Sequence, residues 1–377
     1  WRMSIRRRYT MLRVPRHALA AALIAFALVG CRDAAAPNDA ARSPSAGPRT
    51  THATEATLVR HIVPPKETDP EITLGLSDHY VWLDPTARGN PKLLLFMPGT
   101  NNVPASWQLL GQEAARLGYH VIGLMYQNDV EVVGKCGGSA DANDNRDPDC
   151  SGNMRLEIID GIDHSSNVTV TSANSIDNRL AKLLAYLDHN FADEGWSRFL
   201  EQDGTPKWSQ IAVSGQSQGA GQAALIGTIR QVDRVVMFSG PPDMYSKPVD
   251  GHAPLIDSWI SIGKTPAAKY FALFHDRDHL AVGIRVNLRA LDMERFGAPV
   301  KAEASAPPYG GVHILFTDLR PTQSKVWDYL AVVPGYDRPN PHQSTARDNN
   351  TPLGSDGAPL LRDAWRYLLG EPPRGGP

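Results

Sequence analysis

The pentapeptide Gly215-Gln216-Ser217-Gln218-Gly219 stands between an apolar run at 210–213, which predicts a strand, and residues 219–229, which predict a helix. A serine on such a sharp strand-to-helix turn needs small residues two positions before and after it, because the backbone passes close to itself there. The turn would expose the Ser217 hydroxyl at the edge of a sheet and aim the following backbone N–H at the same place. We interpret Ser217 as a nucleophile; the alternative is an ordinary glycine-rich turn.

The alternation of short β-rich runs and helical runs around this turn predicts the fold class. Residues 92–97 form a continuous apolar run, typical of a strand buried on both faces of a parallel sheet. Residues 176–190 have leucine and isoleucine at helical spacing. We therefore expect an α/β fold with a mostly parallel central sheet, helices on both faces and sites at the carboxyl ends of strands. The other expected strands are 72–76, 79–83, 121–126, 234–238, 270–274 and 313–317, and the other expected helices are 105–117, 282–296 and 360–369.

Composition and length are those of a globular protein with one large domain. Hydrophobic residues make up 42% of the 377 residues and charged residues 21%, which excludes wholesale disorder and a multi-span membrane protein. Residues 1–30 contain six arginines and no acid, so the remainder has 32 Lys+Arg against 40 Asp+Glu. This acidic remainder argues against a nucleic-acid partner. We expect residues 58–370 to form the domain and residues 371–377 a disordered tail.

The amino terminus has the pattern of an export signal. Arginines precede the apolar run 18–28, which is too short to span a bilayer. The run ends in Leu28-Val29-Gly30-Cys31, which resembles the lipobox of bacterial lipoproteins. The resemblance implies a signal peptide at 1–30, a lipidated Cys31 that attaches the protein to a membrane, and a location in the bacterial cell envelope, on its periplasmic or extracellular face. A plain cleaved signal and an uncleaved anchor are the alternatives.

The segments beside this signal have simpler interpretations. Residues 32–57 are rich in Ala, Pro, Ser and Thr without apolar periodicity, which predicts a flexible tether over 31–57. Because position 1 is Trp, we expect the start codon at Met11, or at Met3 where the preceding arginines belong to the protein.

An insertion over 126–176 contains the two cysteines that remain after Cys31. In an oxidising compartment, Cys136 and Cys150 are expected to form a disulfide. The acidic stretch 141–149 puts oxygen ligands at alternate positions, as calcium loops do. Arg146 stands where such loops have glycine and Gly152 where they have a bidentate glutamate, so we favour a solvated, disulfide-tied loop without metal over a calcium site.

The chain resembles the α/β-hydrolase superfamily over 72–370, and its Gly-x-Ser-Gln-Gly-Ala motif is similar to esterase-like and cutinase-like turns. The resemblance implies the chain order serine, acid, histidine, with the acid after the strand following the next one and the histidine after the last strand. A serine needs a base to accept its proton, and that base needs a carboxylate to orient it and offset its charge.

The resemblance assigns the acid and the base to two polar loops. Asp278 follows the expected strand 270–274 and is the expected acid, with Asp276 as the alternative. His342, in a turn-rich loop, is the expected base. His313 begins an apolar strand and stays as the alternative base, because the segment before His342 is long. His279 is adjacent to Asp278 and therefore too close to it to be the separate base.

The loop after the strand 92–97 is expected to complete an oxyanion hole. It reads Pro98-Gly99-Thr100-Asn101, where the superfamily often has His-Gly. We expect the backbone amides of Gln218 and Thr100 to bind the developing negative charge, with Asn101 as the alternative donor.

Together these residues predict a serine hydrolase that needs no cofactor and cleaves a small-molecule or lipid-like carboxylic ester through an acyl-enzyme. A peptidase or thioesterase of the same fold is an alternative, because a fold does not determine its chemistry. The alternatives from another class are a membrane-tethered binding protein without catalysis and a calcium-dependent adhesion module.

Overall fold

The computed structural model describes residues 58–87, 90–137, 147–244, 255–322 and 340–371, which belong to one compact unit. The predicted signal peptide at 1–30, Cys31 and the tether up to residue 57 lie outside the described residues, as do residues 372–377 and most of the acidic stretch 141–149. Glu371, assigned to the tail above, is paired with Arg366 of the last helix, with both carboxylate oxygens accepting at 2.7 Å.

A nine-stranded sheet runs through the described residues in the order β1-β2-β4-β3-β5-β6-β7-β9-β8. The pairs β1/β2 and β2/β4 are antiparallel and every later pair is parallel, which confirms the predicted α/β class with a mostly parallel sheet. The strands are β1 (Val59–Val63), β2 (His79–Leu83), β3 (Leu93–Met97), β4 (His120–Gly123), β5 (Ile211–Gln216), β6 (Arg234–Phe238), β7 (Tyr270–His275), β8 (Val300–Lys301) and β9 (Ile314–Thr317).

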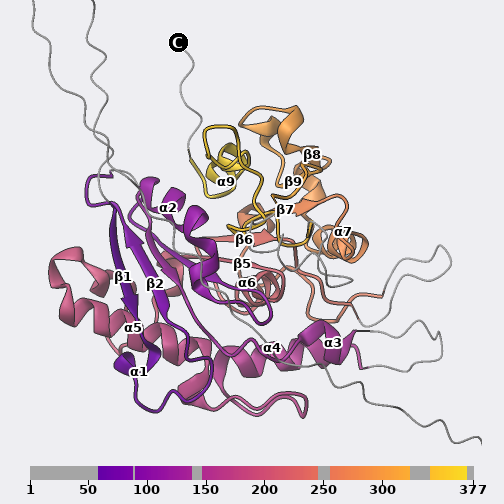
Figure 1. Ribbon diagram of the computed structural model, residues 1–377. Coiled ribbons are helices and arrows are strands. Elements are labelled where there is room, and N and C mark those ends of the chain that lie inside the picture. Colours follow the sequence, from indigo (N-terminus) through magenta and orange to yellow (C-terminus); the bar gives the residue numbers. More distant parts are fainter. Residues whose placement is uncertain (1–57, 88–89, 138–146, 245–254, 323–339, 372–377) are drawn as a thin grey trace, which may run out of the picture. The chain divides into compact units, whose positions relative to one another are not determined.

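Helices cover both faces of this sheet, as Figure 1 shows. All five residues of β3 are buried. Leu95 and Met97 pack into the core under α4 (Cys150–Asp160), α5 (Ile176–Asn190) and α6 (Gln218–Ile229). Leu94 and Phe96 pack into the opposite core, with α2 (Gln108–Arg116) and α9 (Arg362–Leu368). The continuous apolar run therefore serves two cores, since neighbouring side chains of a strand point to opposite faces.

Several predicted helices are confirmed with changed ends. The helix expected at 105–117 begins with the 3-10 turn η1 (Pro104–Trp107) and continues as α2. The helix expected at 282–296 is α7 (Ala281–Ala290) followed by η7 (Met293–Phe296). The helix α5 has the bounds that its apolar spacing predicts, and the Ser175 hydroxyl accepts the Asn178 backbone N–H at its start.

The strand predicted at 72–76 is wrong. The backbone N–H groups of Thr73 and Leu74 donate to the Asn174 side-chain oxygen at 3.0 and 2.9 Å. The carbonyl oxygens of Leu74 and Gly75 accept from the guanidinium of Arg179, which is fully buried. These side chains, about a hundred positions away in the sequence, take the hydrogen bonds that a strand partner would need. β1 pairs with β2 instead.

The described part of the insertion between β4 and α5 includes two helices and is therefore more than the loop that the sequence predicts. It contains α3 (Val132–Cys136) and α4, and the predicted disulfide between Cys136 and Cys150 is present, with its Cα atoms 5.6 Å apart. At the described end of the acidic stretch, Asp147 accepts the backbone N–H of Asp149, and Asp149 accepts the Ser258 hydroxyl. The part of the chain that the structure describes has no group of three or more potential metal ligands.

Candidate active site

Ser217 occupies a strained turn between β5 and α6. Its φ and ψ are 56° and −117°, and residues other than glycine rarely adopt such a positive φ. A Cβ atom on Gly215 would lie 2.3 Å from the Gly219 carbonyl carbon, and one on Gly219 would lie 2.0 Å from the Met97 oxygen. Glycine at both positions is therefore required by backbone contact, as the motif predicts.

The structure brings Ser217, His342 and Asp278 together. His342 Nε2 lies 2.7 Å from Ser217 Oγ, and His342 Nδ1 lies 2.7 Å from Asp278 Oδ2. Because a carboxylate only accepts hydrogen bonds, Nδ1 carries the proton and Nε2 presents its lone pair to the serine hydroxyl. The three residues are separated by 64 and 125 positions in the chain. An imidazole in this tautomer can accept the hydroxyl proton.

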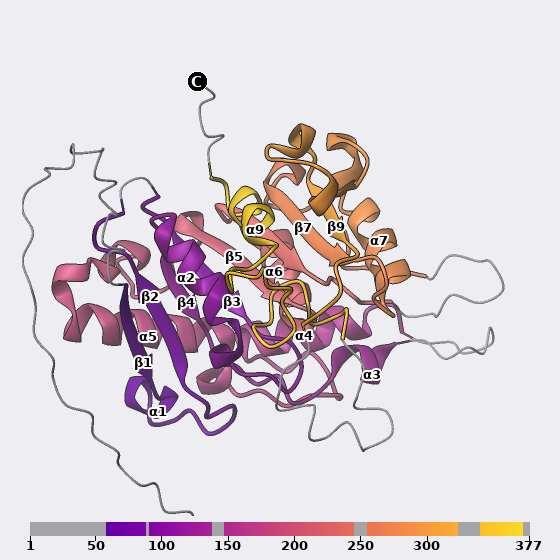
Figure 2. The ribbon, with the colours of Figure 1, turned by 45° about the horizontal axis from the view of Figure 1, so that its top comes forward.

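The segment that carries His342 is anchored to three elements (Figure 2). Gln216, at the end of β5, donates its side-chain amide to the His342 carbonyl at 2.9 Å. Asp348 accepts two backbone N–H groups at the start of α2, and burial raises the pKa of its carboxyl to about 6. Trp365 of α9 donates to the Thr345 carbonyl at 2.8 Å. These contacts hold the imidazole in place although it comes from a loop.

Asp278, not Asp276, contacts the imidazole. The Asp278 side chain is fully buried, and its second oxygen, Oδ1, accepts the Leu280 backbone N–H at 2.9 Å. Asp276 is 45% exposed and forms an ion pair with Arg285. The two carboxylates differ in position because the chain turns immediately after β7.

The other two histidines stand in different environments. The His313 ring is stacked between Phe271 and Phe296, with centroids 4.2 and 3.8 Å away, just before β9 begins and therefore at the sheet edge opposite Ser217. Burial lowers the pKa of His313. The His279 side chain is 73% exposed, and its Nδ1 lies 3.4 Å from Asp278 Oδ1. Neither histidine contacts Ser217.

The expected oxyanion donors lie beside Ser217. Thr100 and Gln218 line the same cavity as Ser217, and the Thr100 hydroxyl donates to the Gln218 side-chain oxygen at 2.8 Å. Among the described residues, no group accepts a hydrogen bond from the backbone N–H of either one. The Asn101 N–H donates to the Asn128 carbonyl at 3.0 Å, which removes the alternative donor.

The cavity at Ser217 has a volume of about 250 Å³. Val132, Val133 and Leu280 supply apolar surface, while Asn340 and Gln343 supply amide groups. Small size and mixed polarity suit a small substrate with an apolar part.

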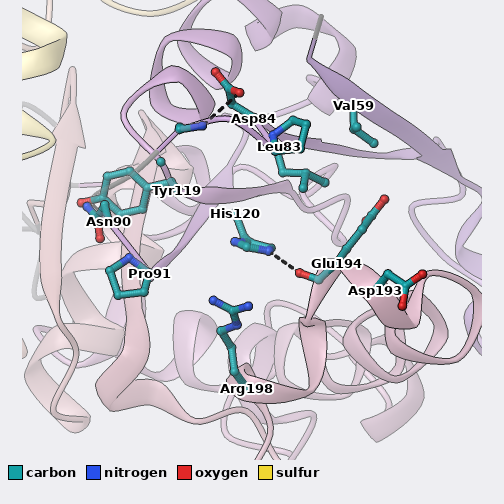
Figure 3. A pocket seen from close by; sticks show the side chains of 13 residues that line it. Val59, Leu83, Asp84, Asn90, Pro91, Tyr119, His120, Asp193, Glu194 and Arg198 are labelled. Atoms are coloured by element: carbon teal, nitrogen blue, oxygen red, sulfur yellow. Dashed lines mark hydrogen bonds between the residues drawn. The ribbon is translucent and has the colours of Figure 1, made fainter. Parts of the chain in front are cut away.

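A larger cavity, of about 460 Å³, lies at the opposite edge of the sheet (Figure 3). There His120, at the start of β4, donates from Nε2 to the Glu194 carbonyl at 2.8 Å, and the Arg198 guanidinium points toward the same space. The described residues that line it include no serine, threonine, cysteine or lysine. Its described lining therefore offers no hydroxyl of serine or threonine, no thiol and no lysine amine, although carboxylates and His120 are present.

Arg155 of α4 is a residue of this region to which the sequence analysis gave no role. Its side chain is fully buried and lines the cavity at Ser217, where it pairs with Asp243. The available signal is a single cation among the mainly apolar residues 154–159, which also include Glu157. Such a residue on a buried helix face needs a partner that the sequence does not identify.

The comparisons with known proteins add no family to this geometry. No protein-family model matches the chain, and no curated protein matches it significantly. No described helix is both long and apolar enough to cross a membrane.

Proposed function

We propose that this protein is a serine hydrolase with an α/β-hydrolase fold that cleaves carboxylic esters. The observation that carries the proposal is the imidazole of His342, which contacts the Ser217 hydroxyl with one nitrogen and the buried Asp278 carboxylate with the other, both at 2.7 Å. Three residues this far apart in the chain, with the serine on a strained turn after a central strand, match the geometry of a catalytic triad. Their order in the chain is also that of α/β hydrolases.

The arrangement supports a two-step acyl transfer. Ser217 Oγ attacks the ester carbonyl carbon while His342 Nε2 takes its proton, and Asp278 stabilises the imidazolium. The backbone N–H groups of Gln218 and Thr100 bind the oxyanion of the tetrahedral intermediate. Its collapse breaks the bond to the alcohol, which leaves with the proton from His342. Water, deprotonated by the same imidazole, then attacks the acyl-enzyme, and the second tetrahedral intermediate releases the carboxylic acid and restores Ser217.

The cavity supports a substrate with a short acyl chain. Its volume of about 250 Å³ is below the ~300–1,000 Å³ of most pockets that bury drug-sized ligands.

We also propose that Cys31 carries the lipid that attaches the protein to a bacterial envelope membrane, since several acyl chains hold a protein more firmly than one. An anchored esterase of this kind would act on esters that reach the membrane surface.

Labelling with a fluorophosphonate tests the hydrolase proposal. The full-length protein in detergent should gain the mass of one phosphonyl group, and Ser217→Ala should gain none. Ser214→Ala is the matched control, because Ser214 lies in the same segment but is fully buried, and it should label like the wild type. An unlabelled wild type would favour the tethered binding protein over the enzyme.

A further inference from the structure

Arg155 connects the insertion to the residue that follows Ser217. Its Nη1 donates to the Gln218 carbonyl at 2.8 Å, while Nε and Nη2 donate to the two carboxylate oxygens of Asp243 at 2.5 Å. The side chains of Arg155 and Asp243 are both fully buried. The guanidinium therefore uses its planar fork on the carboxylate and one further N–H on the backbone.

Gln218 is held by both helices that flank the disulfide. Its side-chain oxygen accepts the backbone N–H of Val132, at the start of α3, at 3.2 Å, and its carbonyl accepts from Arg155 of α4. α3 ends at Cys136 and α4 begins at Cys150. The disulfide thus joins the two supports of one residue, whose own backbone N–H is a proposed oxyanion donor.

The surroundings of the guanidinium are shaped to keep it there. A Cβ atom on Gly221 would lie 2.2 Å from Arg155 Cζ, so the first turn of α6 leaves room for the guanidinium only with glycine at this position. The indole N–H of Trp259 donates to Asp243 Oδ2 at 3.2 Å, and the Trp259 ring centroid lies 5.9 Å from Arg155 Cζ. Asp243 is therefore oriented from a second side.

Stability alone gives little reason for this ion pair. Burying two charges costs about as much as their attraction returns, and well-packed apolar residues are often as stable. No uncharged side chain, however, has the three N–H donors that Arg155 uses here, since a side-chain amide has only two.

We propose that Arg155 is a positioning residue for the proposed hydrolysis. By holding the Gln218 carbonyl, it fixes the backbone on both sides of the Gln218 Cα atom, so that the Gln218 N–H points at the oxyanion. This inference rests on the proposed function. The Gln218 N–H matters only when negative charge develops on the substrate oxygen. Loss of the hydrogen bond from Arg155 to the Gln218 carbonyl should therefore lower kcat and leave KM nearly unchanged.

The test variant is Arg155→Met combined with Asp243→Asn, which removes both charges of the ion pair together. With a short-chain p-nitrophenyl ester, kcat should fall about ten- to a hundredfold while KM stays within about threefold, because loss of a whole oxyanion donor costs about 10²–10³. Inhibition by an alkyl boronic acid, which forms a tetrahedral adduct on the serine, should weaken by the same factor as kcat.

Arg179→Met is the matched control. Arg179 is equally buried, but its N–H groups hold carbonyl oxygens of the 72–76 segment and of Met125, away from Ser217. This variant should lower the melting temperature and leave kcat of the folded protein within about twofold of the wild type. Equal loss of kcat in both variants would mean that any buried arginine matters, and would overturn the assignment.

Other outcomes are equally decisive. If the double variant folds with unchanged kcat and unchanged boronate inhibition, Arg155 is not a positioning residue. If it does not fold, Gly221→Ala takes its place, because the added methyl displaces the guanidinium while both charges remain; kcat should fall at least tenfold, and an unchanged kcat overturns the inference. A wild type that neither hydrolyses esters nor reacts with fluorophosphonate would instead refute the proposed function.

Discussion

Replacement of Asp278 by Asn tests the proposed triad most sharply, because the structure determines which way the new amide must point. Oδ1 of Asp278 accepts the Leu280 N–H at 2.9 Å and Oδ2 accepts the Nδ1 proton of His342 at 2.7 Å. In Asp278→Asn the amide oxygen has to stay on Leu280, since that N–H needs an acceptor. The NH₂ group then faces Nδ1, which must accept, and the imidazole proton moves to Nε2.

The expected magnitude follows from this tautomer. With a proton on Nε2, His342 donates toward Ser217 Oγ and can no longer accept the hydroxyl proton. The wrong tautomer in a serine triad lowers kcat by about 10⁴, or about 5 kcal/mol in the activation free energy. The Asp278 side chain is fully buried, so solvent does not offer Nδ1 an alternative partner. The fold should persist, because the amide has nearly the same shape as the carboxyl group.

The assay compares kcat for p-nitrophenyl acetate between the wild type, Asp278→Asn and Asp276→Asn. Asp276 pairs with Arg285 at the surface, where an ion pair contributes at most about 1 kcal/mol to stability, so Asp276→Asn should keep the wild-type kcat. An Asp278→Asn variant within tenfold of the wild type would refute the reasoning. So would an equal loss of kcat in Asp276→Asn.

Three further predictions concern stability and specificity. Burial and the nearby Asp243 carboxylate raise the pKa of Asp257 to about 7, so the folded protein holds a proton that the unfolded chain, with a pKa near 3.8, releases. The free energy of unfolding should therefore fall by about 2 kcal/mol between pH 5 and 7 in the wild type relative to Asp257→Asn, as measured by urea unfolding; parallel pH profiles would contradict this. Replacing Cys136 and Cys150 by Ser should lower the free energy of unfolding by about 3 kcal/mol in urea and also lower kcat, because both helices beside the disulfide contact Gln218; an unchanged midpoint with unchanged kcat would contradict it. Because the cavity is small, kcat/KM should be higher for p-nitrophenyl acetate and butyrate than for palmitate, and the reverse order would show that longer chains find more room than this cavity offers.

Local patterns in the sequence predicted most of the central strands, several helices and the turn at Ser217, but not β1, β8, α3 or α4. The buried strand β3 follows from five consecutive apolar residues and α5 from apolar residues at helical spacing. The motif glycines predict the strained serine, since only they admit the backbone contacts at Gly215 and Gly219. Such features depend on neighbours within a few positions, which is why the sequence alone could predict them.

Contacts between distant segments decided the rest. The segment 72–76 has the residues of a strand, but Asn174 and Arg179 take its backbone hydrogen bonds. The choice of Asp278 over Asp276 depends on the turn after β7, and the choice of His342 over His313 depends on which segment packs against Gln216. These partners lie from about 60 to more than 120 positions apart in the chain, and residue spacing along a sequence contains no measure of such distances.

The role proposed for Arg155 depends still more on tertiary structure. In the sequence it is one cation in a helix that also contains Glu157 and Asp160, and a solvated or a buried position would fit equally well. Only the packing of α4 on α6 excludes water from the guanidinium and leaves Asp243 and the Gln218 carbonyl as its partners. The sequence determined which side chains the chain can offer, and the tertiary structure decided which of them meet, because burial and hydrogen-bond geometry exist only once distant segments pack together.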